Sequence, residues 1–180
     1  MFKYVKAIRK KIYINKLRRN GNVRLPVKLT IGEFCMISSS TNEGITIGEN
    51  FQLSDFAQLL SWNGSIIIGS HCSINSFSKI VSLDRIALGN NVVIASYVSI
   101  LDHDHDIAFM NDPVLFRQKY KTAQIQIGNN VWIGDKVTIL KGVTIGDNVV
   151  VAANSVVTKN LPSNTVAGGI PAKVLKQINM

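Results

Sequence analysis

A six-residue repeat in the C-terminal third of the chain constrains the fold more than any other feature of the sequence. From residue 127 the chain reads IGNNVW, IGDKVT, ILKGVT, IGDNVV, VAANSV and VTKNLP. Each hexad begins with Ile or Val, and its third and fourth residues are mostly polar or small. A period of six fits neither the 3.6-residue period of a helix nor the two-residue alternation of a long strand. We therefore predict short strands separated by turns, stacked as a parallel β-helix in which three hexads close one coil.

The same frame recurs upstream with interruptions, so we expect most of the chain to belong to one β-helix. Further hexads begin, each with an aliphatic residue followed by glycine, at Ile31, Ile47, Ile68 and Leu88. Their aliphatic side chains should join one interior column. Both cysteines, Cys35 and Cys72, fall at the fifth position of such a hexad, where a small side chain is expected. We interpret both cysteines as structural.

The repeat is interrupted at residues 102–124, which read DHDHDIAFMNDPVLFRQKYKTAQ. A stretch of this length without a hexad is long for a connection in a compact domain, and such loops are usually functional or disordered. The stretch contains two of the three histidines of the chain, His103 and His105, alternating with three aspartates. We expect this segment to leave the β-helix and to carry whatever chemistry the protein performs.

From the residues alone this histidine pair has three interpretations. Imidazole gains and loses a proton near neutral pH, so either histidine can act as a general base, with Asp102 or Asp104 holding its second ring nitrogen. Histidine and aspartate also bind metals, but no cysteine or distant histidine completes a ligand set, so we expect no metal. A solvated loop tip without a chemical role is the third interpretation.

Positive charge is concentrated at the N-terminus. The chain has a net charge of +9, and residues 1–28 hold ten of its 20 Lys and Arg but none of its 11 acidic residues. The rest of the chain is therefore close to neutral. A folded nucleic-acid-binding domain usually carries a basic face on its body, so we expect no nucleic-acid partner.

The basic segment is predicted to form an amphipathic helix. Met1, Val5, Ile8 and Ile12 recur on one face at helical spacing, and most of the basic residues lie opposite. Such a helix can lie on a membrane surface that contains anionic lipid. It can equally cap the first coil of the β-helix with its charges solvated, and the two roles are compatible.

Composition limits the cellular setting. Hydrophobic residues make up 46% of the chain, but no apolar run is long enough to span a bilayer as a helix. The N-terminus lacks the apolar core of a secretory signal, and two cysteines do not build a disulfide framework in a chain this long. We predict a cytoplasmic protein with a basic N-terminal segment at residues 1–24 and a β-helix domain at residues 25–180.

The repeat and its flanking motifs resemble the hexapeptide-repeat acyltransferases. The resemblance covers roughly residues 29–176 and is carried by VWIG at 131–134, by the histidine-bearing loop and by AGGIPAK at 167–173. It implies an all-β, left-handed parallel β-helix with a looped-out segment at about 102–124, a short basic N-terminal helix and a short C-terminal closing segment. It also implies acetyl-CoA as co-substrate, lying in the groove between neighbouring β-helices of a homotrimer.

The same resemblance assigns candidate site residues. The histidine base of the family matches His103, and its site tryptophan matches Trp132, which should line both the cofactor and the acceptor. Contacts to the pantetheine and phosphates of the cofactor map onto Asp135, Ala153, Thr158, Lys159, Lys173 and Lys176. The acceptor-binding asparagine of the sugar-specific members falls on Phe77 by counting, so Asn75 is the nearest substitute. Asp102 is the remaining candidate for acceptor binding.

We therefore predict an acetyl-CoA-dependent O-acetyltransferase that acts on a sugar or glycan by direct transfer, with a histidine as general base. A capsule or lipopolysaccharide precursor is the expected acceptor, and a lipid-linked acceptor would explain the basic N-terminus, with peripheral contact to the inner face of the membrane. Two enzymatic alternatives are an amino-sugar N-acetyltransferase and a xenobiotic acetyltransferase. A non-catalytic β-helix scaffold is the alternative from another class.

Overall fold

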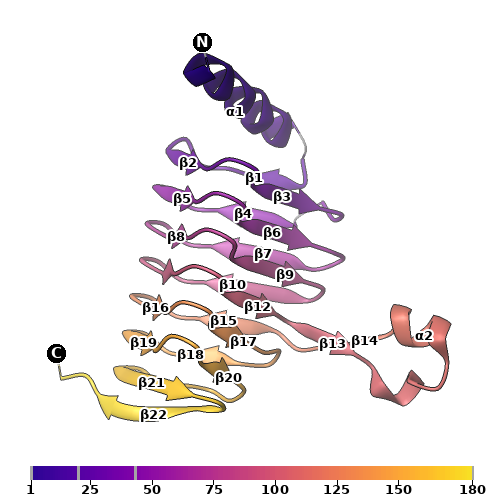
Figure 1. The fold of residues 1–180 in the computed structure, drawn as a ribbon, viewed down its shortest axis with the longest axis vertical. Coiled ribbons are helices and arrows are strands. Elements are labelled where there is room, and N and C mark those ends of the chain that lie inside the picture. Colours follow the sequence, from indigo (N-terminus) through magenta and orange to yellow (C-terminus); the bar gives the residue numbers. More distant parts are fainter. Residues whose placement is uncertain (1, 20, 43, 180) are drawn as a thin grey trace.

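The chain forms a triangular prism of stacked coils, with one helix at its N-terminal end and a loop projecting from its side (Figure 1). The computed structural model describes residues 2–19, 21–42 and 44–179. Each coil takes one strand from each of three sheets, so strands three apart in the sequence become neighbours in space, except between coils 4 and 5, where β13 and β14 intervene. The predicted parallel β-helix is confirmed.

The three sheets, here called A, B and C, form the three faces of the prism. Sheet A consists of β1 (Val23–Arg24), β4 (Ile45–Ile47), β7 (Ser65–Ile68), β10 (Arg85–Leu88), β15 (Ile125–Ile127) and β18 (Thr144–Ile145). Sheet B consists of β2 (Leu29–Ile31), β5 (Phe51–Leu53), β8 (Ser73–Ile74), β11 (Val93–Ile94), β16 (Trp132–Ile133), β19 (Val149–Val151), β21 (Thr165–Gly169) and β22 (Ala172–Gln177). Sheet C consists of β3 (Met36–Ser39), β6 (Gln58–Ser61), β9 (Lys79–Ser82), β12 (Ser99–Leu101), β17 (Thr138–Ile139) and β20 (Val156–Val157). Coils 1 to 4 are β1–β3, β4–β6, β7–β9 and β10–β12, and coils 5 and 6 are β15–β17 and β18–β20.

In-register parallel pairing explains the six-residue period. Ile94 pairs with Ile74 in the preceding coil and with Ile133 in the following one. The six hexad starts from residue 127 onward and the four upstream starts are all buried, as predicted. Each such side chain contributes about 1.5–3 kcal/mol by leaving water. The glycine that follows permits close stacking, because a Cβ on Gly89 would lie 2.8 Å from the carbonyl carbon of Gly128 in the next coil.

The corners of the prism differ in the residues that adopt the left-handed conformation. Where sheet A meets sheet B, these positions hold Asn50, His71, Asn91, Asn130, Asn148 and Asn164. Where sheet B meets sheet C, they hold Phe34, Phe56, Phe77, Tyr97, Lys136 and Asn154. Asparagine tolerates positive φ because its short side chain can hydrogen-bond locally. These positions are therefore polar at the A–B corner from coil 2 onward, whereas at the B–C corner they are aromatic in coils 1 to 4.

Helix α1 (Phe2–Arg19) packs over the open end of the first coil. Leu17 is buried, Tyr13 and Ile14 pack against the core, and the Ile37 N–H donates a hydrogen bond of 2.8 Å to the Tyr13 hydroxyl. Burial raises the pKa of that hydroxyl above its ordinary value. The capping role predicted for the N-terminal segment is thus carried by one face of α1.

The packed face is not the apolar face that the spacing predicted. Ile8 and Ile12 are 58% and 62% exposed, so they point away from the prism. Met1 lies outside the described residues, as do the side chains of residues 2–6, including Val5. None of the described helices is long and apolar enough to cross a bilayer.

The predicted looped-out segment leaves the prism between coils 4 and 5. It consists of an antiparallel ribbon, β13 (His103–His105) with β14 (Tyr120–Thr122), and of two short helices, η1 (Ile107–Phe109) and α2 (Pro113–Gln118), at its tip (Figure 1). At the other end of the prism, β22 pairs antiparallel with β21 and extends sheet B as its closing strand.

Candidate active site

The candidate site begins where coil 4 turns into the loop. Strand pairing aligns Ser39, Ser61 and Ser82 at the end of sheet C in coils 1 to 3, and the next position in this column is Asp102. Ser61, Ser82 and Asp102 are fully buried. A carboxylate in such a place requires hydrogen-bond donors, because an unpaired buried charge is strongly unfavourable.

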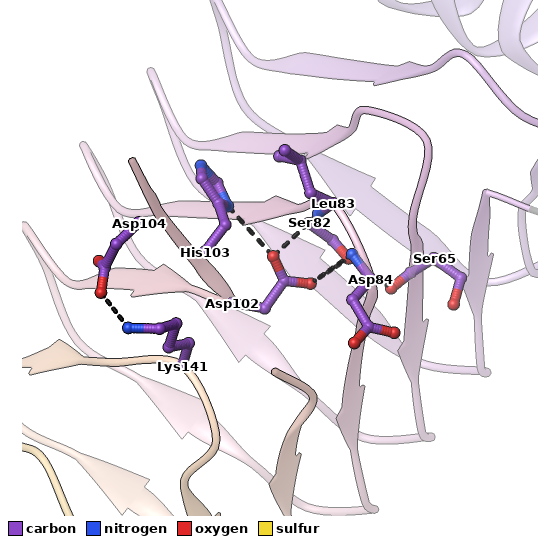
Figure 2. Close-up of polar contacts among 8 residues, drawn as sticks. All are labelled: Ser65, Ser82, Leu83, Asp84, Asp102, His103, Asp104 and Lys141. Carbon is purple, nitrogen blue, oxygen red and sulfur yellow. Dashed lines mark hydrogen bonds and ion pairs between the residues drawn. The ribbon is translucent and has the colours of Figure 1, made fainter. Parts of the chain in front are cut away.

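The preceding coil supplies these donors (Figure 2). The Leu83 N–H lies 2.8 Å from Asp102 Oδ1, and the Asp84 N–H lies 3.0 Å from Oδ2. The Ser82 hydroxyl lies 2.7 Å from Oδ2. The backbone carbonyl of Asp102 accepts a further hydrogen bond from the Ala123 N–H at 2.9 Å, which closes the base of the loop. The carboxylate is therefore fixed on both oxygens by coil 3.

His103 completes this arrangement. Its Nδ1 lies 3.1 Å from Asp102 Oδ1, and its side chain retains 13% exposure. Its ring lies nearly perpendicular to the ring of Tyr120 of β14, with ring centroids 5.6 Å apart. A carboxylate partner keeps the proton on Nδ1 and leaves Nε2 with a lone pair. The geometry suits a histidine that accepts a proton at Nε2.

The other aspartates of the segment support the loop and not the histidine. Asp104 pairs with Lys141 of coil 5 (Figure 2). Asp106 pairs with Lys121 at 3.2 Å, and a hydrogen bond from the Ala108 N–H, followed by Lys121, lowers the pKa of its carboxyl. Of the two candidates for holding the histidine, Asp102 and Asp104, the structure therefore selects Asp102.

His105 is also anchored, but by the loop itself. Its Nδ1 lies 2.8 Å from the carbonyl oxygen of Phe116, and its ring packs against Phe116 and Tyr120 with centroid distances of 5.2 and 4.7 Å. Because a carbonyl oxygen accepts, Nδ1 must donate, and the lone pair of the neutral ring is then on Nε2, as in His103. His105 is exposed. It differs from His103 in having no carboxylate behind it.

Metal binding finds no support in this geometry. Within the described ranges, no group of three or more His, Cys, Asp or Glu comes together as a metal site requires. The histidines and aspartates of the segment engage other groups of the protein instead: His103 pairs with Asp102, His105 with the Phe116 carbonyl, Asp104 with Lys141, Asp106 with Lys121, and Asp112 caps α2.

The cofactor residues expected from the resemblance are spread over two corners and the closing strand. Asp135 and Ala153 lie at the B–C corner, Thr158 and Lys159 follow β20 at the C–A corner, and Lys173 and Lys176 lie exposed on β22. The Oδ1 atom of Asp135 accepts a hydrogen bond of 2.8 Å from the Ser96 N–H, so one of its oxygens already serves the turn between coils.

Two of the three residues expected on the acceptor side, Trp132 and Asn75, lie away from His103. Trp132 is 55% exposed on the outer face of sheet B, whereas His103 leaves the prism at the C–A corner. Asn75 follows β8 at the B–C corner, where its Oδ1 lies 3.5 Å from the Ser54 hydroxyl. Asp102 is buried behind His103 and not on a surface that an acceptor would touch. One copy of the chain therefore does not bring His103 and Trp132 together.

Neither cysteine contributes to the candidate site. Cys72 is buried in sheet B and Cys35 is half-buried in coil 1, and both donate to backbone carbonyls. Burial raises the pKa of both thiols. This agrees with the structural role predicted for them.

Sequence reasoning missed the residues that hold the pair in place. These are Ser82 and the N–H groups of Leu83 and Asp84, which hold Asp102. Lys141, which pairs with Asp104 at the base of the loop, was missed as well. The recurrence of serine at positions 39, 61 and 82 was the available signal, since it marks a column that admits polar side chains. Lys141 gives no such signal, because its partner lies on a loop outside the repeat.

Comparisons with known proteins place this geometry in context. Residues 124–159 match the family described as bacterial transferase hexapeptide (six repeats). The chain is 36% identical over 146 residues to WbbJ of Escherichia coli K12, which is named for O-acetyl transfer in lipopolysaccharide biosynthesis, and the match covers 77% of this chain and 74% of WbbJ. It is 38% identical over 134 residues to galactoside O-acetyltransferase of the same organism, over 74% of this chain and 64% of that enzyme.

A solved structure shows the same fold. A mutant of AntD, an N-acyltransferase from Bacillus cereus, in complex with dTDP-4-amino-4,6-dideoxyglucose and coenzyme A, matches with a TM-score of 0.72 at 23% identity. The match covers 92% of this chain and 89% of AntD. The left-handed β-helix expected from the resemblance is therefore confirmed.

Proposed function

This chain belongs to the hexapeptide-repeat transferase family, and we propose that it transfers an acetyl group from acetyl-CoA to a hydroxyl of a sugar or glycan. The names of the two relatives, and the amino-sugar nucleotide and coenzyme A bound by AntD, support this chemistry. The observation in this chain that carries the proposal is the Asp102–His103 pair. WbbJ favours a lipopolysaccharide or capsule precursor as the acceptor class.

His103 is the general base in this proposal. Its Nε2 takes the proton of the acceptor hydroxyl while the oxygen attacks the thioester carbonyl. The carbon–sulfur bond then breaks, and the imidazolium returns the proton to the departing thiolate. The products are an acetyl ester and free CoA, and His103 ends in its starting state. Direct transfer is favoured over an acyl-enzyme because both thiols are structural and the burial that raises their pKa disfavours the thiolate.

The complete site in this proposal lies between copies of the chain. His103 lies at the C–A corner, and Trp132 lies on the outer face of sheet B. Two such surfaces face each other when the C–A corner of one copy approaches the B–C corner of the next. Repeating that contact around an axis parallel to the prism closes a ring, and a homotrimer is the ring that we propose.

In the same arrangement, the separate cofactor residues could all contact one molecule of acetyl-CoA. Asp135, Ala153 and Trp132 from one copy, with Thr158 and Lys159 from the next, would border an extended groove. Lys173 and Lys176 on β22 would meet the phosphates of CoA. Substituting both lysines with Ala should raise the KM for acetyl-CoA more than it lowers kcat, because phosphate binding is equal in ground and transition states.

The N-terminal helix is proposed to contact the membrane as well as to cap the first coil. A groove of about 460 Å³ lies between α1 and coil 1, and basic and apolar side chains share its lining: Ala7, Lys10, Lys11, Ile14, Asn15, Arg18, Val27 and Leu29. Exposed Ile8 and Ile12 lie on the same helix. Anionic lipid would satisfy both the charge and the apolar surface, and a lipid-linked acceptor would then be presented to an enzyme held at the inner face of the membrane.

Release of free thiol from acetyl-CoA tests the catalytic proposal. The assay is run with glycans, amino-sugar nucleotides and xenobiotic alcohols as acceptors. The wild type should release thiol with a glycan hydroxyl acceptor, and His103→Ala should lower kcat by about 10²–10⁴-fold with little change in acetyl-CoA binding. His71→Ala is the matched control, because His71 lies exposed at the A–B corner. Full activity of His103→Ala would remove it as the base.

A further inference from the structure

Four aromatic side chains form a stacked ridge along the B–C corner. Adjacent ring centroids in the order Phe34, Phe56, Phe77 and Tyr97 are 5.0, 4.9 and 5.0 Å apart, and adjacent planes are within 15° of parallel. The four residues come from coils 1 to 4, and we call them the aromatic ridge. Their exposed fractions are 74%, 43%, 48% and 54%.

Both the backbone conformation and the exposure to water are unfavourable for aromatic residues at these four positions. All four have φ between 56° and 62°, a conformation that is unfavourable for a bulky side chain. The equivalent position in coil 6 is Asn154, and the A–B corner uses asparagine almost throughout. Large apolar groups on a water-exposed strained position indicate that something other than the isolated fold requires them.

The shape of the ridge favours a protein surface over a small substrate. Small ligands bind in concave sites, but a corner of a prism is convex, and stacked rings present their edges outward. If a fully exposed aromatic residue offers roughly 200 Å², the exposed fractions leave about 440 Å² of aromatic surface in water. That is more than half of the roughly 800 Å² that each partner contributes to a stable interface.

The C–A corner of a second copy offers a counterpart. Strand pairing places Trp62, Leu83 and His103 in one column of that corner, in coils 2, 3 and 4. Trp62 is 49% exposed. Around an axis parallel to the prism, equal coils of neighbouring copies lie at equal height. A contact that brings His103 of one copy to the level of Tyr97 of the next therefore brings Trp62 to the level of Phe56.

We propose that the aromatic ridge is the seam between copies of this chain, with Trp62 of the neighbouring copy packed against it. The proposal rests on the between-copies site of the proposed function and specifies which residues close it. The B–C corner is then divided along its length. Coils 1 to 4 present aromatic rings that hold the neighbour, and coils 5 and 6 present the polar positions Lys136 and Asn154 beside the proposed cofactor groove.

The test is a dilution series followed by light scattering and sedimentation velocity. The variant Phe34→Asn/Phe56→Asn places at the ridge the residue that this fold prefers at positive φ, so it should fold, which circular dichroism verifies. We expect it to dissociate at a protein concentration on the order of 100-fold or more above that of the wild type, and to lose thiol release in parallel. Trp62→Ser should shift dissociation in the same direction. His71→Asn, the same exchange at the A–B corner, should leave dissociation unchanged.

The outcomes separate this inference from the proposed function. A trimer whose dissociation is unchanged in both variants overturns the seam and leaves the between-copies site standing. A trimer that stays intact while the KM for the glycan acceptor rises shows that the ridge binds acceptor, which also overturns the seam. A wild type that is active and monomeric overturns the seam and the between-copies site together, whereas thiol release alone decides the acetyl-transfer chemistry.

Discussion

Asp102 and Asp104 lie two residues apart in two different kinds of structure. Asp102 occupies the last position of a coil, is fully buried, and receives hydrogen bonds from the coil before it. Asp104 lies on the projecting ribbon, is about half exposed, and pairs with the flexible Lys141. The coil fixes a side chain through backbone groups that repeat at every turn, whereas the loop holds one through contacts made only there. His103 is the first residue of the projecting ribbon, and its ring is held by Asp102, the last residue of the coil.

The difference has an energetic consequence. An exposed ion pair such as that of Asp104 contributes about 0–1 kcal/mol. Each hydrogen bond to a buried carboxylate contributes about 1.5–3 kcal/mol, and leaving its donors unpaired costs a similar amount. The same substitution should therefore have very different effects on stability and activity at Asp102 in the coil and at Asp104 on the loop.

The largest effect is expected from Asp102→Asn compared with Asp104→Asn. An amide NH₂ in place of Oδ1 would face both the Leu83 N–H and His103 Nδ1, and the histidine would lose the acceptor that fixes its tautomer. An NH₂ in place of Oδ2 would face the Asp84 N–H, and the histidine would keep only a neutral acceptor. We expect kcat to fall by about 10²–10⁴-fold and the free energy of unfolding to fall by about 2–4 kcal/mol. Thiol release and urea unfolding measure the two effects.

Asp104→Asn serves as the control for that exchange. It removes the same charge within two residues and should change kcat by less than about threefold, because an exposed pair stabilises little. Equal losses in the two variants would mean that net charge on the loop, and not the buried network, sets the activity.

The next effect concerns stability in the two regions. Ile133 is fully buried in coil 5, and Ile107 is 70% exposed at the tip of the loop. Ile133→Ala should lower the free energy of unfolding by about 2–5 kcal/mol through lost burial and a cavity. Ile107→Ala should stay within about 0.5 kcal/mol of the wild type. Urea unfolding compares them, and a loop variant as destabilised as the coil variant would show that the loop is part of the cooperative core.

A smaller effect is expected at the second histidine. His105→Ala removes the hydrogen bond to Phe116 and the ring contacts that hold the loop tip. If His103 is the base, kcat should fall by less than about tenfold, because only the positioning of the loop is loosened. The decisive comparison is with His103→Ala in the same thiol-release assay. A larger loss in His105→Ala would transfer the role of base to the histidine anchored by the backbone.

The sequence predicts the coils of the β-helix better than it predicts the contacts of the looped-out segment and of α1. The hexad starts and the extent of the looped-out segment follow from the repeat, because each coil meets the same environment as its neighbours. The choice of Asp102 over Asp104 follows only if the column of serines at positions 39, 61 and 82 is recognised, because Asp102 continues that column and Asp104 does not. Helical spacing also does not identify the face of α1 that packs. The packed face carries Tyr13 and Leu17, because contact with the first coil decides which side chains are buried. The sequence pattern does not predict the aromatic ridge. Its members lie about one coil apart in the sequence, at turn positions where asparagine is the usual residue.

The smallest effect is expected from Cys72→Val, which tests how completely a coil determines its interior. Cys72 aligns with Phe51 and Val92 in sheet B, so valine suits the column and should change stability at pH 7 by less than about 1.5 kcal/mol. Burial raises the pKa of the Cys72 thiol, so the folded state keeps its proton at a pH where the unfolded chain, with a thiol pKa of about 8.5, has lost it. Ionisation then favours the unfolded state, and stability declines as the pH rises above about 8.5. In Cys72→Val the free energy of unfolding should therefore decline less steeply with pH than in the wild type. Some decline should remain, because burial raises the pKa of the Cys35 thiol too. Urea unfolding at pH 7 and 9.5 under reducing conditions measures the slope, and an unchanged slope would show that the Cys72 thiol ionises as readily inside the coil as outside it.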